Sequence, residues 1–499
     1  MLRFAVYNES GPADAWSVEG AFALGPEDLA TKASIAFEAG QIVVDRKGDD
    51  AVALGLQFDS GRSGELVLQT CLLPSRDRPY HLAVELARHR IKMFIAKSEE
   101  WQMFDLAADH PAVLRWEEAR RLLTSALTVD DPIGADRRAR QALTLGIEAT
   151  ELLALAHAEL LLHHRFGARA ASSTTLGVRV WPERDSGPLK ELVKRDLDLM
   201  MLPVRWRSLE VEEGSYDWGP LDRWIEWARG IGKPIVLGPL LDFSKRNIPD
   251  WLYVWQHDYE TCRDMVYDHL ERVVYRYRNV VSMWNLGAGV NVNDNFQFTP
   301  EQMIDLVRTA SLLVRQGNRR ARAMIEVVQP FGEYVGRTNN AVAPMTFVER
   351  VVQEGVRLDA VGVRLLLGSG EAGLETRDLM QVSNVLDRFF HLDLPVLVSA
   401  AGVPAGQQAG GGNWHGDWSP IQQAKWGSRV FAIAMSKPFV ESIFWTDLYD
   451  HDGAELDTGG LIDDDGRTRP VLSKLIGMRK RLRKPLGRRD TIASKQIAS

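Results

Sequence analysis

Charged residues interrupt several segments that otherwise have the apolar character of buried strands. They are the basic residues Arg179, Arg205 and Arg364 and the acidic residues Asp242, Glu326 and Asp447. Unpaired buried charges are costly, so we expect these side chains to form a network. Carboxylates can act as acids, bases or nucleophiles, and arginines bind anionic groups such as a uronate or a phosphate. Two interpretations are open. The arginine–carboxylate pairs either have a purely structural role in packing the barrel interior, or they form an altered polar pocket in which Glu326 or Asp242 is the acid or base.

Four tryptophans are candidates for holding a sugar ring, because the C–H face of a pyranose packs on an indole. Trp414 and Trp418 lie in the glycine-rich stretch 402–420, a loop longer than the ~12–15 residues beyond which loops are usually functional. Trp284 and Trp445 fall on predicted strands. The chain has 15 tryptophans, and many of them are expected in the core. For each of these four, a core position is therefore as well supported as a sugar-binding one. The asparagine-rich stretch 289–299 either binds hydroxyls or closes its own turns.

A repeated pattern of strand, loop and helix from Leu176 to Leu482 would position these residues. Eight strands are expected, with the sequences LGVRV, LMMLPVRW, PIVLG, VVSMWNL, ARAMIEVV, LDAVGVRLLL, PVLVSA and SIFWTD. Eight strands alternating with helices predict an α/β fold, a (β/α)8 barrel over 171–482. A charge on such a strand must point into the barrel or lie at its mouth, because helices cover the outside.

Two further regions precede this barrel, and a tail follows it. Residues 1–78 contain short β-branched runs separated by turn residues, which predict a small β-rich domain. Residues 79–170 have helical periodicity and predict a connecting helical collar, with helices opening at Pro111 and Pro132 and the last ending near Gly167. The basic, polar tail 483–499 is expected to be disordered.

The stretch 206–241 carries a run of motifs from a known enzyme family. They are Trp206, Leu209, Glu210, Gly214, Tyr216, Asp222 and the helix containing Ala228. Three later segments match motifs of the same family, in the same order along the chain: residues 249–252, SIFWTDLYDHDG and GLIDDDGRTRPVL. Over about 174–482 the chain resembles the xylanase-type glycoside hydrolases of family 10. The resemblance implies a TIM barrel acting on carbohydrate, and it raises the possibility that the β-rich domain is a carbohydrate-binding module rather than a structural one.

The resemblance places two catalytic glutamates at the ends of barrel strands four and seven, and both are missing here. The acid/base glutamate of the fourth strand corresponds to Gly289 in the motif 284–289. The nucleophile of the seventh strand corresponds to Ala400 in the motif 399–402. Neither glycine nor alanine can transfer a proton or attack carbon, so the family's retaining mechanism is expected to be absent.

Other positions that surround the sugar in the family also differ. They are Pro239, Phe243 and Ser244 on the third strand, Leu366 on the sixth, and Met201, Leu202 and Arg205 on the second. Replacement across this many strands is not an engineered knock-out. We expect a site that evolution rebuilt or abandoned.

Two functions of different classes follow. The favoured hypothesis is a degenerate member that binds a glycan or a protein partner without the retaining mechanism. The alternative is an active glycosidase, or a related lyase, with relocated carboxylates at Glu326, Asp242 or Asp447. Under either hypothesis the predicted substrate-binding residues are the three arginines and four tryptophans named above.

Bulk properties exclude several other classes. The 499 residues predict two or three domains, and a net charge of -7 disfavours a nucleic-acid binder. Cys71 and Cys262 form no disulfide framework or metal motif, and no Gly-rich phosphate loop occurs, so no metal or cofactor is expected. The N-terminus lacks a signal-peptide pattern, and no apolar run reaches the ~18–20 residues that span a bilayer. A cytoplasmic location without membrane attachment is therefore predicted.

Overall fold

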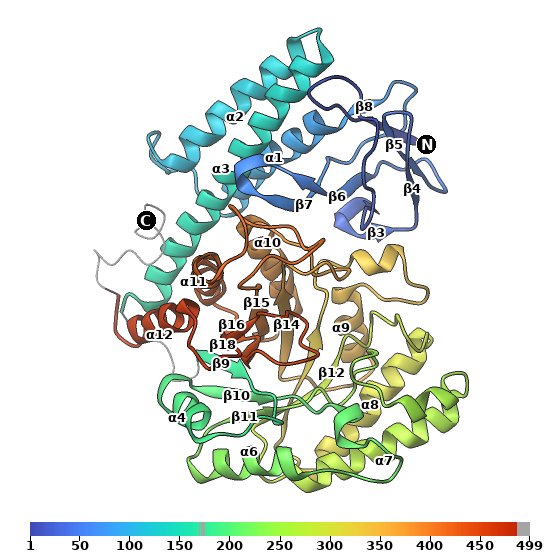
Figure 1. The fold of residues 1–499 in the computed structure, drawn as a ribbon, viewed down its shortest axis with the longest axis vertical. Coiled ribbons are helices and arrows are strands. Elements are labelled where there is room, and N and C mark those ends of the chain that lie inside the picture. The colour runs from blue at the N-terminus through green and yellow to red at the C-terminus, as the bar shows by residue number, and fades with distance from the viewer. Residues whose placement is uncertain (169, 171–174, 487–499) are drawn as a thin grey trace.

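The computed structural model describes residues 1–168, 170 and 175–486. A closed barrel of parallel strands forms its largest part (Figure 1). The barrel strands are β9 (Leu176–Arg179), β10 (Leu199–Leu202), β11 (Ile235–Leu237), β12 (Met283–Ala288), β13 (Arg322–Val327), β14 (Ala360–Leu366), β15 (Val396–Gly402) and β16 (Val440–Trp445). Pairing of β16 with β9 closes the ring, which confirms the predicted (β/α)8 architecture.

The barrel interior is built in layers, because successive residues of a strand point to opposite faces. Its lower layer is an apolar cluster made of Leu199, Met201, Val236, Met283, Met324, Ala360, Leu397 and Phe444. Two residues further along their strands, Asn285, Glu326 and Ser399 point inward as well, and these three side chains meet. The strand period therefore places a polar layer directly above the apolar one, toward the carboxyl ends of the strands.

Helices surround the barrel and bury their apolar faces against it. They are α4 (Gly187–Asp196), α5 (Trp206–Leu209), α6 (Gly219–Gly230), α7 (Tyr259–Tyr277), α8 (Pro300–Gly317), α9 (Pro344–Gln353), α10 (Leu379–Phe389), α11 (Pro420–Ser436) and α12 (Pro470–Leu482). Four of them begin with proline at the first position, where the missing N–H costs nothing. Short 3-10 turns lie at η3 (Asp250–Trp255), η4 (Glu333–Gly336) and η5 (Phe390–Leu392).

The N-terminal region contains two four-stranded sheets, as its β-branched runs predict. One sheet has the order β4 (Ser34–Glu38), β5 (Gln41–Asp45), β1 (Leu2–Ala5), β8 (Tyr80–His81). The other has the order β3 (Ala30–Thr31), β2 (Phe22–Leu24), β6 (Ala53–Asp59), β7 (Glu65–Gln69). The turns η1 (Pro26–Asp28) and η2 (Gly61–Ser63) complete this region.

Three long helices connect the sheets to the barrel: α1 (Leu82–Glu100), α2 (Pro111–Thr128) and α3 (Pro132–Phe166). In Figure 1, α3 runs from the N-terminal sheets down the side of the barrel, and it packs against α10 and α11. Pro111 and Pro132 open α2 and α3, and Gly167 caps α3, as predicted from the sequence. The helical region is thus a bridge with contacts on both sides.

Two predicted strand boundaries are wrong. Arg205 was assigned to the second barrel strand, but β10 ends at Leu202 and Arg205 is the residue that caps α5. Asp447 was assigned to the end of the eighth strand, but β16 ends at Trp445. Asp447 begins a separate strand, β17 (Asp447–Tyr449), which pairs with β18 (Gly460–Ile462). Most of the predicted disordered tail, from residue 487, lies outside the described residues.

Candidate functional site

An open pocket of about 300 Å³ lies at the mouth of the barrel, where the carboxyl ends of the strands meet. Its volume is at the lower end of the range of ~300–1,000 Å³ typical of small-molecule sites. Charged residues on its walls are Arg179, Arg205, Asp242, Lys245, Arg246, Asp294, Arg364, Glu371 and Glu455. Apolar residues of the lining include Phe243, Val290 and Val292. The pocket thus combines ionic groups with an apolar wall.

Glu326 lies beneath the pocket, and its carboxylate is fully engaged. It accepts hydrogen bonds from Arg364 Nε at 2.9 Å, from the Ser399 hydroxyl at 2.9 Å and from Asn285 Nδ2 at 2.7 Å. Burial alone would raise the pKa of Glu326, but Arg364, Arg179 and the Ser399 hydroxyl outweigh it and hold the pKa at about 2. Glu326 is only 2% exposed and is not part of the pocket wall. This geometry makes it a buried counterion rather than a proton donor.

Arg364 and Glu455 connect this buried layer to the pocket. Arg364 Nη1 lies 2.8 Å from Glu455 Oε1, and Arg179 Nη1 lies 3.4 Å from Glu455 Oε2. Burial opposes the charge on Arg364, but Glu326 and Glu455 outweigh it and raise the arginine's pKa. Burial likewise opposes the charge on Glu455, and Arg364 and Arg179 together lower its pKa. Glu455 is therefore an ionised carboxylate in the pocket wall.

Glu455 is not among the site residues predicted from the sequence. It lies beyond β17, in the stretch 450–459, which contains several acids that ordinarily occur in solvated loops. A signal was available, since this loop follows the last barrel strand and therefore belongs to the catalytic face of a TIM barrel. Only the fold brings the loop back over β9 and β14.

Asp242 occupies the pocket wall as predicted. It follows β11, and its carboxylate accepts the Ser244 N–H at 2.9 Å. Burial raises the pKa of Asp242, and the nearby Glu455 carboxylate adds to this effect, whereas Arg364 opposes it. Two of the pocket's carboxyl groups, those of Asp242 and Glu455, therefore have pKa values that their surroundings shift in opposite directions.

Asp447 does not line the pocket and has a different role from the one predicted. It accepts the indole N–H of Trp181 at 2.5 Å and the Thr446 hydroxyl at 3.0 Å. His451 Nε2 lies 3.5 Å away. Burial would raise the pKa of Asp447, but His451 and Arg179 lower it. Asp447 fixes Trp181, which is itself a pocket residue that the sequence analysis missed.

The four tryptophans predicted to bind sugar are all buried and lie outside the pocket lining. Trp445 donates its indole N–H to Gly459 O at 2.7 Å, and Trp418 donates to Gly412 O at 3.1 Å. Trp284 is fully buried in the core, and among the described residues its indole N–H has no acceptor. The expectation that Trp414 and Trp418 are exposed platforms is wrong, because the long loop folds back onto the protein.

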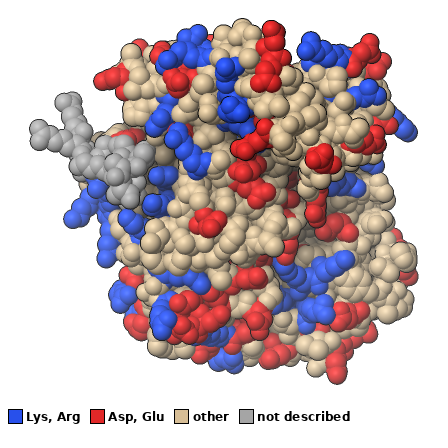
Figure 2. Space-filling view, turned by 45° about the horizontal axis from the view of Figure 1, so that its top comes forward, with Lys and Arg blue, Asp and Glu red and all other residues tan. Residues whose placement is uncertain are grey.

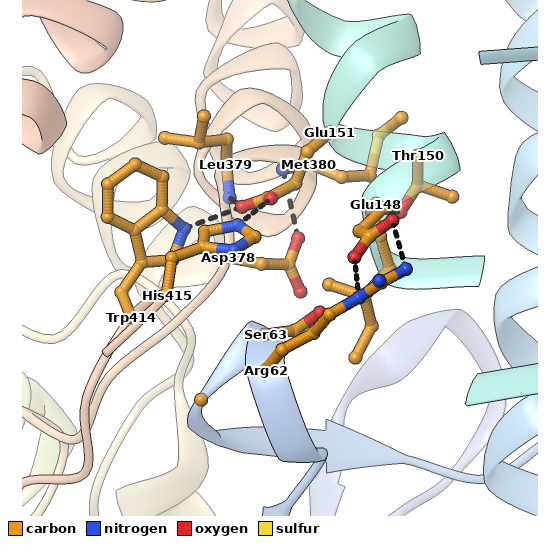
Figure 3. Close-up of polar contacts among 12 residues, drawn as sticks. Arg62, Ser63, Glu148, Thr150, Glu151, Asp378, Leu379, Met380, Trp414 and His415 are labelled. Atoms are coloured by element: carbon orange, nitrogen blue, oxygen red, sulfur yellow. Dashed lines mark hydrogen bonds and ion pairs between the residues drawn. The ribbon is translucent and has the colours of Figure 1, made fainter. Parts of the chain in front are cut away.

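Trp414 and its neighbour His415 fasten that loop to the helical bridge (Figure 3). The buried carboxylate of Glu151, on α3, accepts the Trp414 indole N–H at 2.6 Å and lies 2.5 Å from His415 Nε2. The same carboxylate accepts the backbone N–H of Leu379, the first residue of α10, at 3.1 Å. Next to it, Asp378 caps α10 and forms an ion pair with Arg90 of α1. This set of contacts is structural, and it joins the N-terminal region to the barrel.

The asparagines of the stretch after β12 form hydrogen bonds within their own turn and with neighbouring segments. Asn293 exchanges two hydrogen bonds with the backbone of Phe298, and Asn291 Nδ2 donates to Val342 O at 3.1 Å. Asn295 Nδ2 donates to Phe243 O and to the Tyr253 hydroxyl. Of the two interpretations left open by the sequence, these hydrogen bonds favour the structural one.

The two positions predicted to correspond to the family's glutamates lie toward the carboxyl ends of the expected strands, β12 and β15. Gly289 directly follows β12, with a φ of +61°, and a Cβ there would lie 2.7 Å from Val328 Cγ2. Ala400 lies on β15 and is fully buried. It packs in an apolar cluster with Leu366, Leu374 and Leu456. Hydrocarbon therefore occupies the space around the seventh-strand position.

The described residues contain no group of three or more His, Cys, Asp or Glu side chains arranged to hold a metal ion. In the same described ranges, no helix combines the length and the apolar character needed to cross a bilayer. Basic and acidic side chains are interspersed over the molecular face in Figure 2.

The fold and the pocket at the carboxyl ends of its strands define a glycosidase-type TIM barrel. The model of glycosyl hydrolase family 10 matches residues 169–470, and the chain belongs to this family. Among similar proteins, endo-1,4-beta-xylanase 3 of Hypocrea jecorina is 25% identical over 189 residues, which cover 36% of this chain and 52% of that enzyme. Endo-1,4-beta-xylanase B of Thermotoga neapolitana is 23% identical over 286 residues, or 55% of this chain and 77% of the relative.

Solved structures of the same family also match the chain. A family 10 structure from Paenibacillus barcinonensis matches with a TM-score of 0.49 and 16% identity. The matched region covers 62% of this chain and 96% of the Paenibacillus chain. A Thermotoga petrophila xylanase 10B, solved with xylobiose, covers 64% of this chain and 96% of its own, with a TM-score of 0.47 and 14% identity. The family membership makes this a carbohydrate-related protein. The match spans about half the length of the Hypocrea enzyme.

Proposed function

We propose that the barrel binds a saccharide in the pocket at its mouth and does not hydrolyse it by the family's two-glutamate retaining mechanism. The observation that carries the proposal is the apolar cluster of Leu366, Leu374, Ala400 and Leu456. A retaining glycosidase needs an ionised nucleophile about 5–5.5 Å from the acid/base carboxyl. Leucine side chains pack around position 400, and neither position 400 nor position 289 carries a carboxyl group.

Binding is supported by what the pocket retains. It is open, it has ionic groups that can hydrogen-bond hydroxyls, and it has an apolar side formed by residues such as Phe243 and Val292. Small-molecule sites commonly combine these two kinds of lining. The proposed ligand is a saccharide, in keeping with the family, and a cytoplasmic location stays a prediction.

A second candidate function is hydrolysis by relocated carboxylates, and one observation favours it. The pKa of Asp242 is raised and that of Glu455 is lowered, within the same pocket. Carboxyl pairs whose environments separate their pKa values are how glycosidases assign an acid and a base. Under this candidate Asp242 would donate the proton and Glu455 would act as the base or nucleophile.

One experiment separates the two candidates. Binding to an oligosaccharide array and hydrolysis of aryl glycosides and xylo-oligosaccharides would be measured for the parent chain, Asp242→Asn and Glu455→Gln. Glu118→Gln, on the distant helix α2, is the control. We expect saturable binding of at least one saccharide without turnover. Turnover that both pocket variants abolish and the control retains would establish the second candidate, and binding to no saccharide would overturn the first.

A further inference from the structure

The arginines of the pocket differ in whether an acidic partner holds them. Three are paired: Arg364 with Glu326 and Glu455, Arg179 with Glu455, and Arg246 with Glu371. Among the described residues, the guanidinium of Arg205 has no hydrogen bond and no ion pair, although it lines the same pocket. Five N–H donors therefore face the cavity region without an acceptor from the protein.

Arg205 is nevertheless held in position. Its guanidinium carbon lies 4.3 Å from the centre of the Trp181 ring, a stacking distance for a cation on an indole. Trp181 cannot easily move, because its indole N–H is donated to the buried carboxylate of Asp447. Arg205 thus lies on a rigid aromatic surface rather than extending freely into solvent, and such a guanidinium loses little freedom when it binds.

The charge on Arg205 is not balanced by its surroundings. Its side chain is half-buried, and burial lowers the pKa of Arg205, while Arg179 and Arg246 nearby lower it further. Glu183 and Asp242 oppose these effects and raise the pKa of Arg205, but among the described residues neither carboxylate forms an ion pair with it. A cation in this environment is stabilised by a ligand that brings its own negative charge.

We infer that Arg205 is a specificity-determining residue that receives an anionic group of the saccharide, a carboxylate or a phosphate, at the Trp181 wall of the pocket. Two parallel N–H donors of a guanidinium match the two oxygens of such a group. The apolar side of the pocket, with Val290 and Val292, faces the remainder of the sugar. The inference rests on the proposed saccharide binding and adds the charge of the ligand to it.

The test compares two neutral saccharides, each with a counterpart that carries an added anionic group. Xylotriose, xylotriose bearing one glucuronate, glucose and glucose 6-phosphate would be titrated calorimetrically into the parent chain, Arg205→Met and Arg205→Lys. Arg120→Met is the matched control, since Arg120 also stacks on a tryptophan, Trp116, but on the remote helix α2. The same titrations at about 0.05 and 0.5 M NaCl would report the ionic component.

We expect the charged member of at least one pair to bind the parent about ten- to hundred-fold more tightly than the neutral member, the range of a charge-assisted hydrogen bond. Arg205→Met would remove that preference, Arg205→Lys would retain part of it, and Arg120→Met would leave it intact. The pair that shows the preference identifies a carboxylate or a phosphate as the group. Equal binding of neutral and charged probes would overturn the inference and leave the saccharide proposal standing. Binding to no saccharide, on these probes and on the array, would instead overturn the proposal itself.

Discussion

At the scale of single residues, the roles of the acidic side chains differ between the barrel interior and the loops at its mouth. Glu326 lies in the barrel interior and is satisfied by three donors, whereas Asp242 and Glu455 lie slightly higher and line the pocket. A carboxylate with three hydrogen bonds and a buried arginine is stable as an anion and has no spare lone pair directed at a ligand. The geometry therefore favours a structural role for Glu326, as the buried counterion of Arg364, over the predicted catalytic role.

Removing the arginine from this layer should destabilise the barrel. In Arg364→Met the buried Glu326 keeps its charge without its main partner, which costs about 3–5 kcal/mol of unfolding free energy. Arg322→Met, on the neighbouring strand β13, removes only a solvent-exposed pair with Glu441 and should cost no more than about 1 kcal/mol. Urea denaturation measures both values, and equal losses would show that Glu326 is not the buried counterion described here.

The apolar cluster at β15 makes a second prediction. Ala400→Glu should not restore xylan hydrolysis and should lower the unfolding free energy by on the order of 3 kcal/mol, because it places a large polar side chain at a fully buried position among three leucines. Ala400→Val tests side-chain size without charge and should cost less than the glutamate. Release of reducing sugar by Ala400→Glu, with unchanged stability, would contradict the idea that the nucleophile position has been filled.

At the scale of elements, the loop after β15 shows how a long glycine-rich segment becomes ordered. Glu151 of α3 holds Trp414, His415 and the first N–H of α10 at the same time. Burial would raise the pKa of Glu151, but His415 and the other donors bring it to about 2. Burial would lower the pKa of His415, but Glu151 outweighs it and raises that pKa.

These two shifts predict how stability depends on pH. The raised pKa of His415 means that its contribution is complete below its unfolded pKa, near 6.5, and is lost as pH rises through the folded value. The lowered pKa of Glu151 means that its contribution is complete above about 4.5 and is lost as pH falls toward 2. His415→Gln should therefore cost most unfolding free energy between these limits and progressively less in alkaline solution.

Denaturation of the parent and His415→Gln across this pH range measures the difference directly. His391→Gln, which changes an exposed histidine on η5, is the matched control and should give a small difference that does not vary with pH. A difference between parent and His415→Gln that stays constant with pH would show that the Glu151–His415 pair does not titrate as described.

At the scale of the whole molecule, the N-terminal region packs directly against the barrel. Strand β7 donates Val67 N–H to Thr376 O, Arg90 pairs with Asp378, and α3 packs against two barrel helices. The first two contacts reach the segment between β14 and α10, which also carries the pocket residues Glu371 and Leu374. They hold the N-terminal region on the barrel and support its fold.

Deletion of the region should therefore weaken the barrel. A chain of residues 175–499 would expose the apolar faces of α10 and α11 that α3 covers and would leave Asp378 without Arg90. We expect a lower thermal midpoint and aggregation on heating, measured by scanning calorimetry and light scattering. Arg90→Met in the full chain should lower the midpoint to a smaller extent, and an unchanged midpoint in the short chain would contradict the structural role.

The sequence by itself determined the repeating strand and helix pattern, the family and the pocket positions of Arg179, Arg205, Arg364 and Asp242. Local periodicity and short-range motifs encode these features. The replacement of both catalytic glutamates stays a prediction. The tertiary structure alone decided that Glu326 is buried, that Asp447 holds Trp181, that four tryptophans are covered and that Glu455 reaches the pocket. Each of these features depends on where a loop packs against the rest of the protein. Contacts between residues far apart in the sequence determine that position.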